Sequence, residues 1–158
     1  MPDKQFPSCF PSDFEEKILP PNLLPLKIVV FRVCTTDTIC KDSFLSTFEA
    51  TLSGKRREPP NWKEQLRDPG VYSVSCNDSE KDALNVLKCL TRYYPDPFIM
   101  KGTASSELGP MQYTIERDPQ YKFKSHIDWW LYADSDPSPG FEMVPIPQNE
   151  QEKQPAPV

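Results

Sequence analysis

The chain has 158 residues, a formal charge of −5 and 19 prolines, and hydrophobic residues make up 37% of it. This length suits one domain with one core, and no stretch approaches the ~18 consecutive apolar residues of a membrane span. The acidic balance disfavours nonspecific nucleic-acid binding, which needs clustered positive charge. We therefore expect no membrane association and no nucleic-acid partner.

Cysteine and histidine usage bears on compartment and metal binding. The five cysteines form no C-x-x-C pair, and the chain has a single histidine. Several cysteines sit in apolar patterns, as reduced cysteines do in a core. No basic stretch followed by an apolar segment marks a secretory signal. These features predict a cytoplasmic protein without a metal site.

Prolines cluster at the two ends. Six lie within residues 1–26, six within 137–158, and seven in the 110 residues between. Because proline removes a backbone donor and fixes φ, both ends are poor in regular structure. We expect an apolar arm over 1–25 that drapes over the core or another subunit, one domain over 26–147, and a disordered tail over 148–158.

The central segment alternates between strand and helix patterns. In chain order it predicts a strand at 26–34, helices at 42–52 and 62–67, a strand at 71–76, a helix at 78–93, and strands at 98–103, 111–117, 126–132 and 141–146. Over 126–132 the periodicity is also compatible with a helix. Asn61 and Asn77 stand where N-caps belong, and Pro145 suits an edge strand. The pattern therefore predicts an α+β fold with five or six strands and two main helices.

Polar residues stand inside three of the predicted strands. Arg32 lies in the first strand, Ser73 and Ser75 in the second, and Glu116 in the strand over 111–117. A buried arginine is costly unless its charge is paired or faces a cleft. Arg32 therefore either pairs with Glu116 as a structural ion pair or belongs to a site.

In this order the residues resemble the Arg…Ser-x-Ser…Glu pattern of ADP-ribosyltransferase-like folds. The resemblance implies that Arg32, Ser73 and Tyr72 contact an NAD cofactor, and that Ser75 and Glu116 are catalytic. A carboxylate at the last position would stabilise the positive charge that develops on the ribose. Val74 and Thr114 depart from the family's pattern, so the resemblance implies an NAD-binding domain with or without transfer activity.

A non-enzymatic, partner-binding protein is the alternative. It rests on the aromatic arm and on the adjacent Trp129 and Trp130, which point to opposite faces if they lie in a strand. One ring would then meet the core, and the other would meet the arm or a protein partner. We therefore expect the two tryptophans to differ sharply in exposure.

Two further features fit ordinary structural roles. Lys55, Arg56 and Arg57 precede Glu58 and two prolines, which is typical of a solvated loop. His126 lies near the tryptophans in a predicted strand, where a lone histidine is usually a packed, hydrogen-bonded residue.

Overall fold

The centre of the fold is a long antiparallel pair of strands. In a computed structural model, which describes residues 4–145, the β-branched run after Leu26 forms β1 (Lys27–Cys34). It pairs along its whole length with β3 (Phe98–Ser105), from Lys27↔Ser105 to Cys34↔Phe98. Valine and isoleucine favour this extended, half-buried geometry, and both strands lie where the sequence predicts them.

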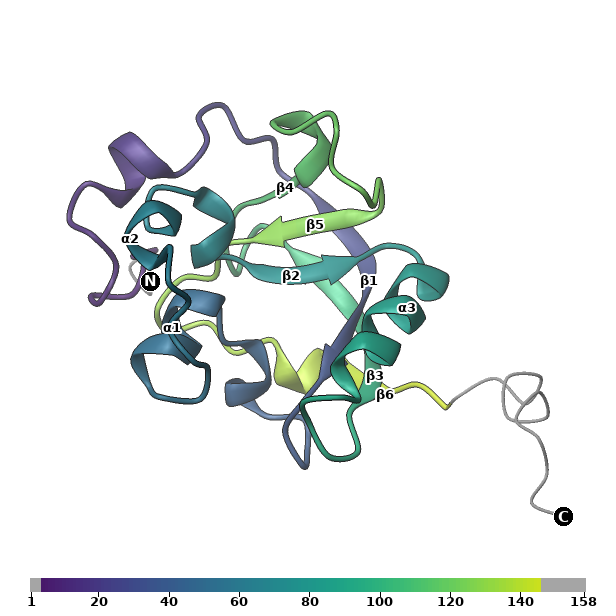
Figure 1. The fold of residues 1–158 in the computed structure, drawn as a ribbon. Helices are drawn as coiled ribbons and strands as arrows, with labels where there is room; N and C mark the ends of the chain where they lie inside the picture. Colours follow the sequence, from purple (N-terminus) through teal and green to yellow (C-terminus); the bar gives the residue numbers. More distant parts are fainter. Residues whose placement is uncertain (1–3, 146–158) are drawn as a thin grey trace, which may run out of the picture.

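Four shorter strands complete one antiparallel sheet of six strands in the described chain (Figure 1). They are β2 (Val74–Asn77), β4 (Met111–Tyr113), β5 (His126–Trp129) and β6 (Phe141–Met143). The order is β4-β5-β2-β1-β3-β6, so β6 is an edge strand, as predicted, although Pro145 lies two residues beyond its end. With the helices, this sheet confirms the predicted α+β fold.

The helices are shorter than the sequence indicates. The predicted helix at 42–52 splits into a 3₁₀ turn (Lys41–Phe44) and α1 (Thr47–Leu52). Ser46 breaks it because its hydroxyl accepts a hydrogen bond from the Glu49 backbone N–H at 3.1 Å and caps α1.

Of the two predicted asparagine caps, Asn61 occupies the N-cap position and Asn77 does not. Helix α2 (Trp62–Gln65) follows Asn61, whose side chain makes no capping bond. Helix α3 (Glu80–Leu90) is capped by Ser79, because Asn77 is still the last residue of β2. The main helix therefore begins two residues later than predicted and ends three residues earlier.

Two predicted strands are also shortened by 3₁₀ turns. The segment at 71–76 begins as a turn (Pro69–Tyr72), because the Asp68 side chain accepts from the Gly70 N–H at 2.9 Å. The segment at 111–117 leaves the sheet after Tyr113 and forms another turn (Thr114–Glu116). Thr114 and Glu116 therefore do not share a strand face.

The N-terminal arm completes a second apolar core. Residues Phe10, Phe14 and Ile18, the last two in a single π-helical turn (Phe14–Ile18), pack with Tyr72 and Trp130. Trp130 lies just past the end of β5, and its Nε1 donates to the Pro69 carbonyl at 2.8 Å. The arm therefore covers this chain's own core.

The tryptophan prediction is wrong. Trp129 packs in the sheet core and Trp130 under the arm, and both are 0% exposed. Different layers cover the two rings, but neither ring faces solvent. The tail predicted for 148–158 lies outside the described residues, and within residues 4–145 no helix has the length and apolar character needed to cross a membrane.

Candidate functional site

A pocket of about 600 Å³ opens between the sheet and the helices and loops around it. Strands β1, β2 and β5 supply part of its wall. Helices α1 and α3, which lie to the left and right of β2 in Figure 1, also contribute lining residues. Its volume lies within the ~300–1,000 Å³ typical of small-molecule sites. Arg32, Ser73, Ser75 and His126 all line it.

Arg32 binds the pocket wall through backbone oxygens. Its Nη1 donates to the Ser75 carbonyl at 2.7 Å, its Nε to the Ser43 carbonyl at 3.0 Å, and its Nη2 to the Leu45 carbonyl at 3.4 Å. Among the described residues it has no carboxylate within ion-pair distance, so the predicted Arg32–Glu116 ion pair is wrong. Burial lowers the pKa of Arg32, but an arginine keeps its charge at neutral pH.

Of the other four residues named by the resemblance, two line the pocket and two do not. Ser75 is exposed in the pocket, and Ser73 is buried at its wall. Tyr72 lies outside the pocket lining, 1% exposed in the arm core, where its hydroxyl donates to the Leu66 carbonyl at 2.7 Å. Glu116 is exposed at the end of its 3₁₀ turn and is also outside the pocket lining. The fold thus brings Arg32, Ser73 and Ser75 together and leaves Tyr72 and Glu116 apart.

A buried carboxylate organises the polar residues behind the pocket. Asp128, only 2% exposed, pairs with the Arg117 guanidinium at 2.7 Å between Nη1 and Oδ2. Its Oδ1 accepts from the Ser73 hydroxyl at 2.7 Å, and its Oδ2 also accepts from the Thr114 hydroxyl at 2.8 Å. The buried charge is therefore paired and hydrogen-bonded, as such a charge must be.

His126 connects this network to the pocket. Its Nδ1 lies 2.6 Å from the Thr114 hydroxyl oxygen, and the Tyr121 ring packs beside it with centroids 4.8 Å apart. Burial lowers the pKa of His126, and the nearby Arg117 and Arg32 lower it further against the opposing effect of Asp128. The imidazole is therefore neutral at pH 7.

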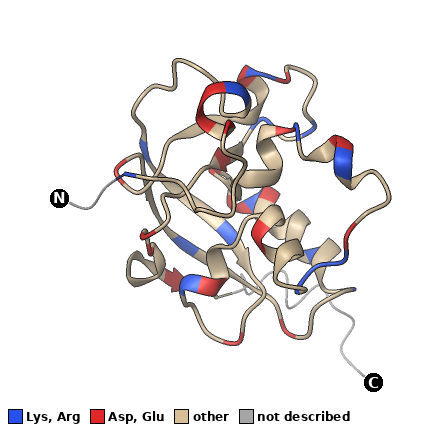
Figure 2. Ribbon diagram, turned by 90° about the vertical axis from the view of Figure 1, so that its left-hand side faces the viewer, with Lys and Arg blue, Asp and Glu red and all other residues tan. Residues whose placement is uncertain are grey.

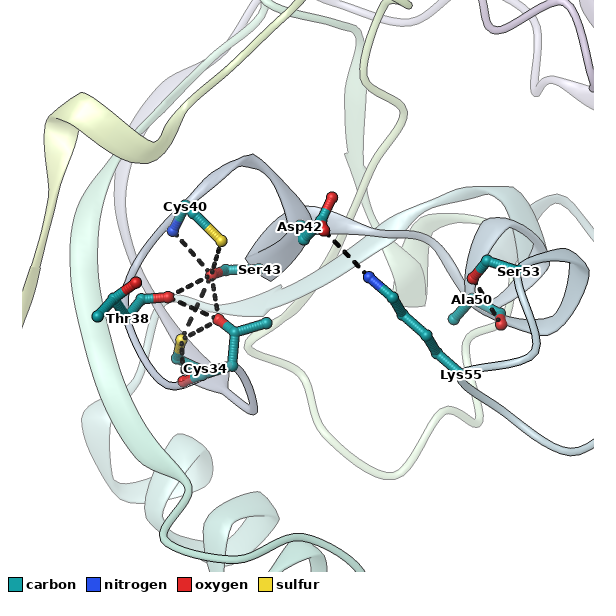
Figure 3. A network of polar contacts seen from close by, with 9 residues as sticks. Cys34, Thr38, Cys40, Asp42, Ser43, Ala50, Ser53 and Lys55 are labelled. Carbon is teal, nitrogen blue, oxygen red and sulfur yellow. Dashed lines mark hydrogen bonds and ion pairs between the residues drawn. The ribbon is translucent and has the colours of Figure 1, made fainter.

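The pocket lining is cationic although the chain is acidic. Arg32, Lys55 and Arg56 line the pocket, and Asp42 is the one carboxylate among the described lining residues. Lys55 pairs with Asp42 at 3.1 Å (Figure 3), which leaves the two arginines uncompensated. Elsewhere charges of both signs are mixed along the chain (Figure 2). The pocket therefore favours an anionic ligand.

A hydrogen-bonded turn fixes the wall that carries Asp42. The Ser43 hydroxyl lies within hydrogen-bond distance of the Thr36 hydroxyl and of the Cys34 and Cys40 sulfurs (Figure 3). The Cys40 N–H also donates to this oxygen, at 3.0 Å. These bonds hold the Ser43 carbonyl where Arg32 reaches it.

Sequence reasoning missed several pocket residues. Lys55 and Arg56 lie exposed in a loop, as predicted, but the sequence does not indicate that they and His126 line the pocket. The usable signal is the alternation of polar residues along two segments, with Ser73, Ser75 and Asn77 at and within β2 and His126 and Asp128 in β5. Strand pairing sets Ser75 opposite Asp128 and Asn77 opposite His126.

The chain matches no known protein family, no curated protein and no solved structure. Within the described residues, no group of three histidine, cysteine or acidic side chains is placed to hold a metal ion.

Proposed function

We propose that the pocket binds a phosphate-bearing nucleotide, with NAD as the ligand that the sequence resemblance names. The observation that carries this proposal is the uncompensated positive charge of the pocket lining in a chain of net charge −5. A phosphate group would supply the missing negative charge.

Arg32 is suited to this role because its backbone bonds hold it without neutralising it. A guanidinium has five N–H groups, and three of them donate to carbonyl oxygens. Two N–H groups remain, and charge-assisted bonds from arginine to phosphate are among the strongest in proteins. Arg56 adds an exposed guanidinium at the same pocket.

Aromatic side chains support a nucleotide over a simple anion. Tyr94, Tyr121 and Phe123 line the pocket and are half-buried there. Aromatic rings stack on nucleobases, which adds about 1–3 kcal/mol per base in nucleic-acid complexes. Because Glu116 lies outside the pocket lining, the proposal is one of binding and does not include ADP-ribosyl transfer by that carboxylate.

Calorimetric titration with NAD tests the proposal, and two adjacent arginines provide a matched pair of variants. Arg56 lines the pocket, whereas Arg57 is also exposed but does not line it. Arg56→Ala should weaken NAD binding about 10-fold or more, since a hydrogen bond to a charged group contributes ~1.5–3 kcal/mol. Arg57→Ala should bind like the wild type. Absence of both heat and thermal shift at millimolar NAD would reject the proposal.

The partner-binding alternative remains a prediction, but its motivation was an exposed tryptophan or a free aromatic arm. Both tryptophans are fully buried by this chain, and the aromatic arm packs on its own core. No exposed tryptophan is therefore available in the described chain as an interface anchor.

A further inference from the structure

The orientation of His126 assigns a specific role to one of its ring nitrogens. The Thr114 hydroxyl has one proton and donates it to the Asp128 carboxylate, which can only accept. The same oxygen lies 2.6 Å from His126 Nδ1, so it must accept from an Nδ1–H group. In a neutral imidazole the other nitrogen, Nε2, then has no proton.

Nε2 is the ring nitrogen of His126 that is available to bond with a ligand in the pocket. Nδ1 faces the buried network, His126 lines the pocket, and within residues 4–145 no hydrogen bond reaches Nε2. Two of the cationic side chains that line the pocket, Arg32 and Arg56, are donors without an accepting atom. A pocket that contains both an acceptor ring nitrogen and two guanidinium groups suits a ligand with both a negative charge and a hydroxyl.

We propose that His126 Nε2 is a hydrogen-bond acceptor for a sugar hydroxyl of a phosphorylated ligand, held in that tautomer by Thr114 and Asp128. This inference rests on the proposed nucleotide pocket and adds a specificity-determining residue to it. The cationic side chains bind the phosphate, and the histidine selects ligands that also carry a hydroxyl donor.

The groups that face His126 are consistent with this assignment. Asp128 favours its protonated form, whereas burial and the charges of Arg117 and Arg32 oppose that form. Tyr121 covers one side of the ring, and Asn77 lies opposite in the strand pairing. The ring is thus fixed by contacts on several sides and presents a lone pair rather than an N–H to the pocket.

The tautomer can be measured without any ligand. This is the chain's one histidine, so long-range proton–nitrogen NMR correlations report on it alone. We expect the Nδ1–H tautomer in the wild type at neutral pH and a shift towards Nε2–H in Thr114→Val, which removes the accepting oxygen. A dominant Nε2–H signal in the wild type would overturn the inference.

Binding of AMP and inorganic phosphate then separates this inference from the pocket proposal. His126→Phe should weaken AMP binding about 10-fold, because a ligand hydroxyl would lose its acceptor, and it should leave phosphate binding unchanged. Arg56→Ala should weaken both. If the wild type binds neither probe, the pocket proposal and this inference both fail. If His126→Phe leaves AMP binding intact or weakens both probes equally, only this inference fails.

Discussion

Replacing Phe14 with alanine tests whether the N-terminal arm is part of the folded core. Phe14 is 2% exposed, and its ring makes edge contacts with Phe6, Phe10 and Tyr72 at centroid distances of 4.9, 4.9 and 5.1 Å. Burying roughly 150–250 Å² of aromatic surface at ~25 cal/mol per Å² gives about 4–6 kcal/mol. Measured core Phe→Ala substitutions cost ~3–5 kcal/mol. We therefore expect Phe14→Ala to lower the free energy of unfolding by about 4 kcal/mol.

Urea denaturation measures this loss, and the same arm contains a control. Leu24 is 76% exposed, so Leu24→Ala should change stability by no more than about 0.5 kcal/mol. The transition midpoint should shift in Phe14→Ala with an unchanged slope, since the slope reports the surface exposed on unfolding. Equal stabilities of the two variants would show that the arm does not pack on the core and would refute the reasoning.

Three further predictions concern the buried network and a close backbone approach. Asp128→Asn should cost about 3–5 kcal/mol in urea denaturation, because it leaves a guanidinium unpaired, whereas the exposed Asp118→Asn should be nearly neutral. The pKa of His126 is lower in the folded than in the unfolded chain, so the unfolded chain binds a proton more readily as the pH falls. Acidification through pH 6.5 should therefore lower the free energy of unfolding of the wild type more than that of His126→Gln. Parallel plots of this free energy against pH for the two proteins would contradict the prediction. Gly109→Ala should cost more than about 3 kcal/mol in thermal or urea unfolding, because its Cβ would overlap the neighbouring backbone, while Gly140→Ala meets nothing within 4 Å. Equal effects of the two glycine variants would refute that clash.

The sequence by itself determined which segments are apolar enough to form the core. The β-branched run of β1, the apolar stripe of α3 and the phenylalanines of the arm are local patterns, and each contributes buried residues to a hydrophobic core. Hydrophobic periodicity predicts such elements because burial depends mainly on side-chain type and spacing. The edge position predicted for the last strand agrees with the sheet order, although Pro145 lies two residues beyond the end of β6.

Two features at the ends of β4 and β5 depended on bonds between segments distant in the sequence. The strand predicted over 111–117 ends at Tyr113, and the next residue, Thr114, bonds to Asp128. Trp130 is buried although β5 ends one residue earlier, because its indole N–H reaches Pro69 beneath the arm. No local pattern encodes either contact.

Only the tertiary structure decided the composition of the candidate site. Arg32, Ser73 and Ser75 of the Arg…Ser-x-Ser pattern line one pocket. Glu116 lies outside the pocket lining, whereas His126 belongs to it. A residue's place in a site depends on which strands pair and in which register. Here the pairing of β2 with β5 sets Ser75 opposite Asp128, across 53 positions of sequence. That pairing is a long-range contact that side-chain periodicity within each strand does not specify.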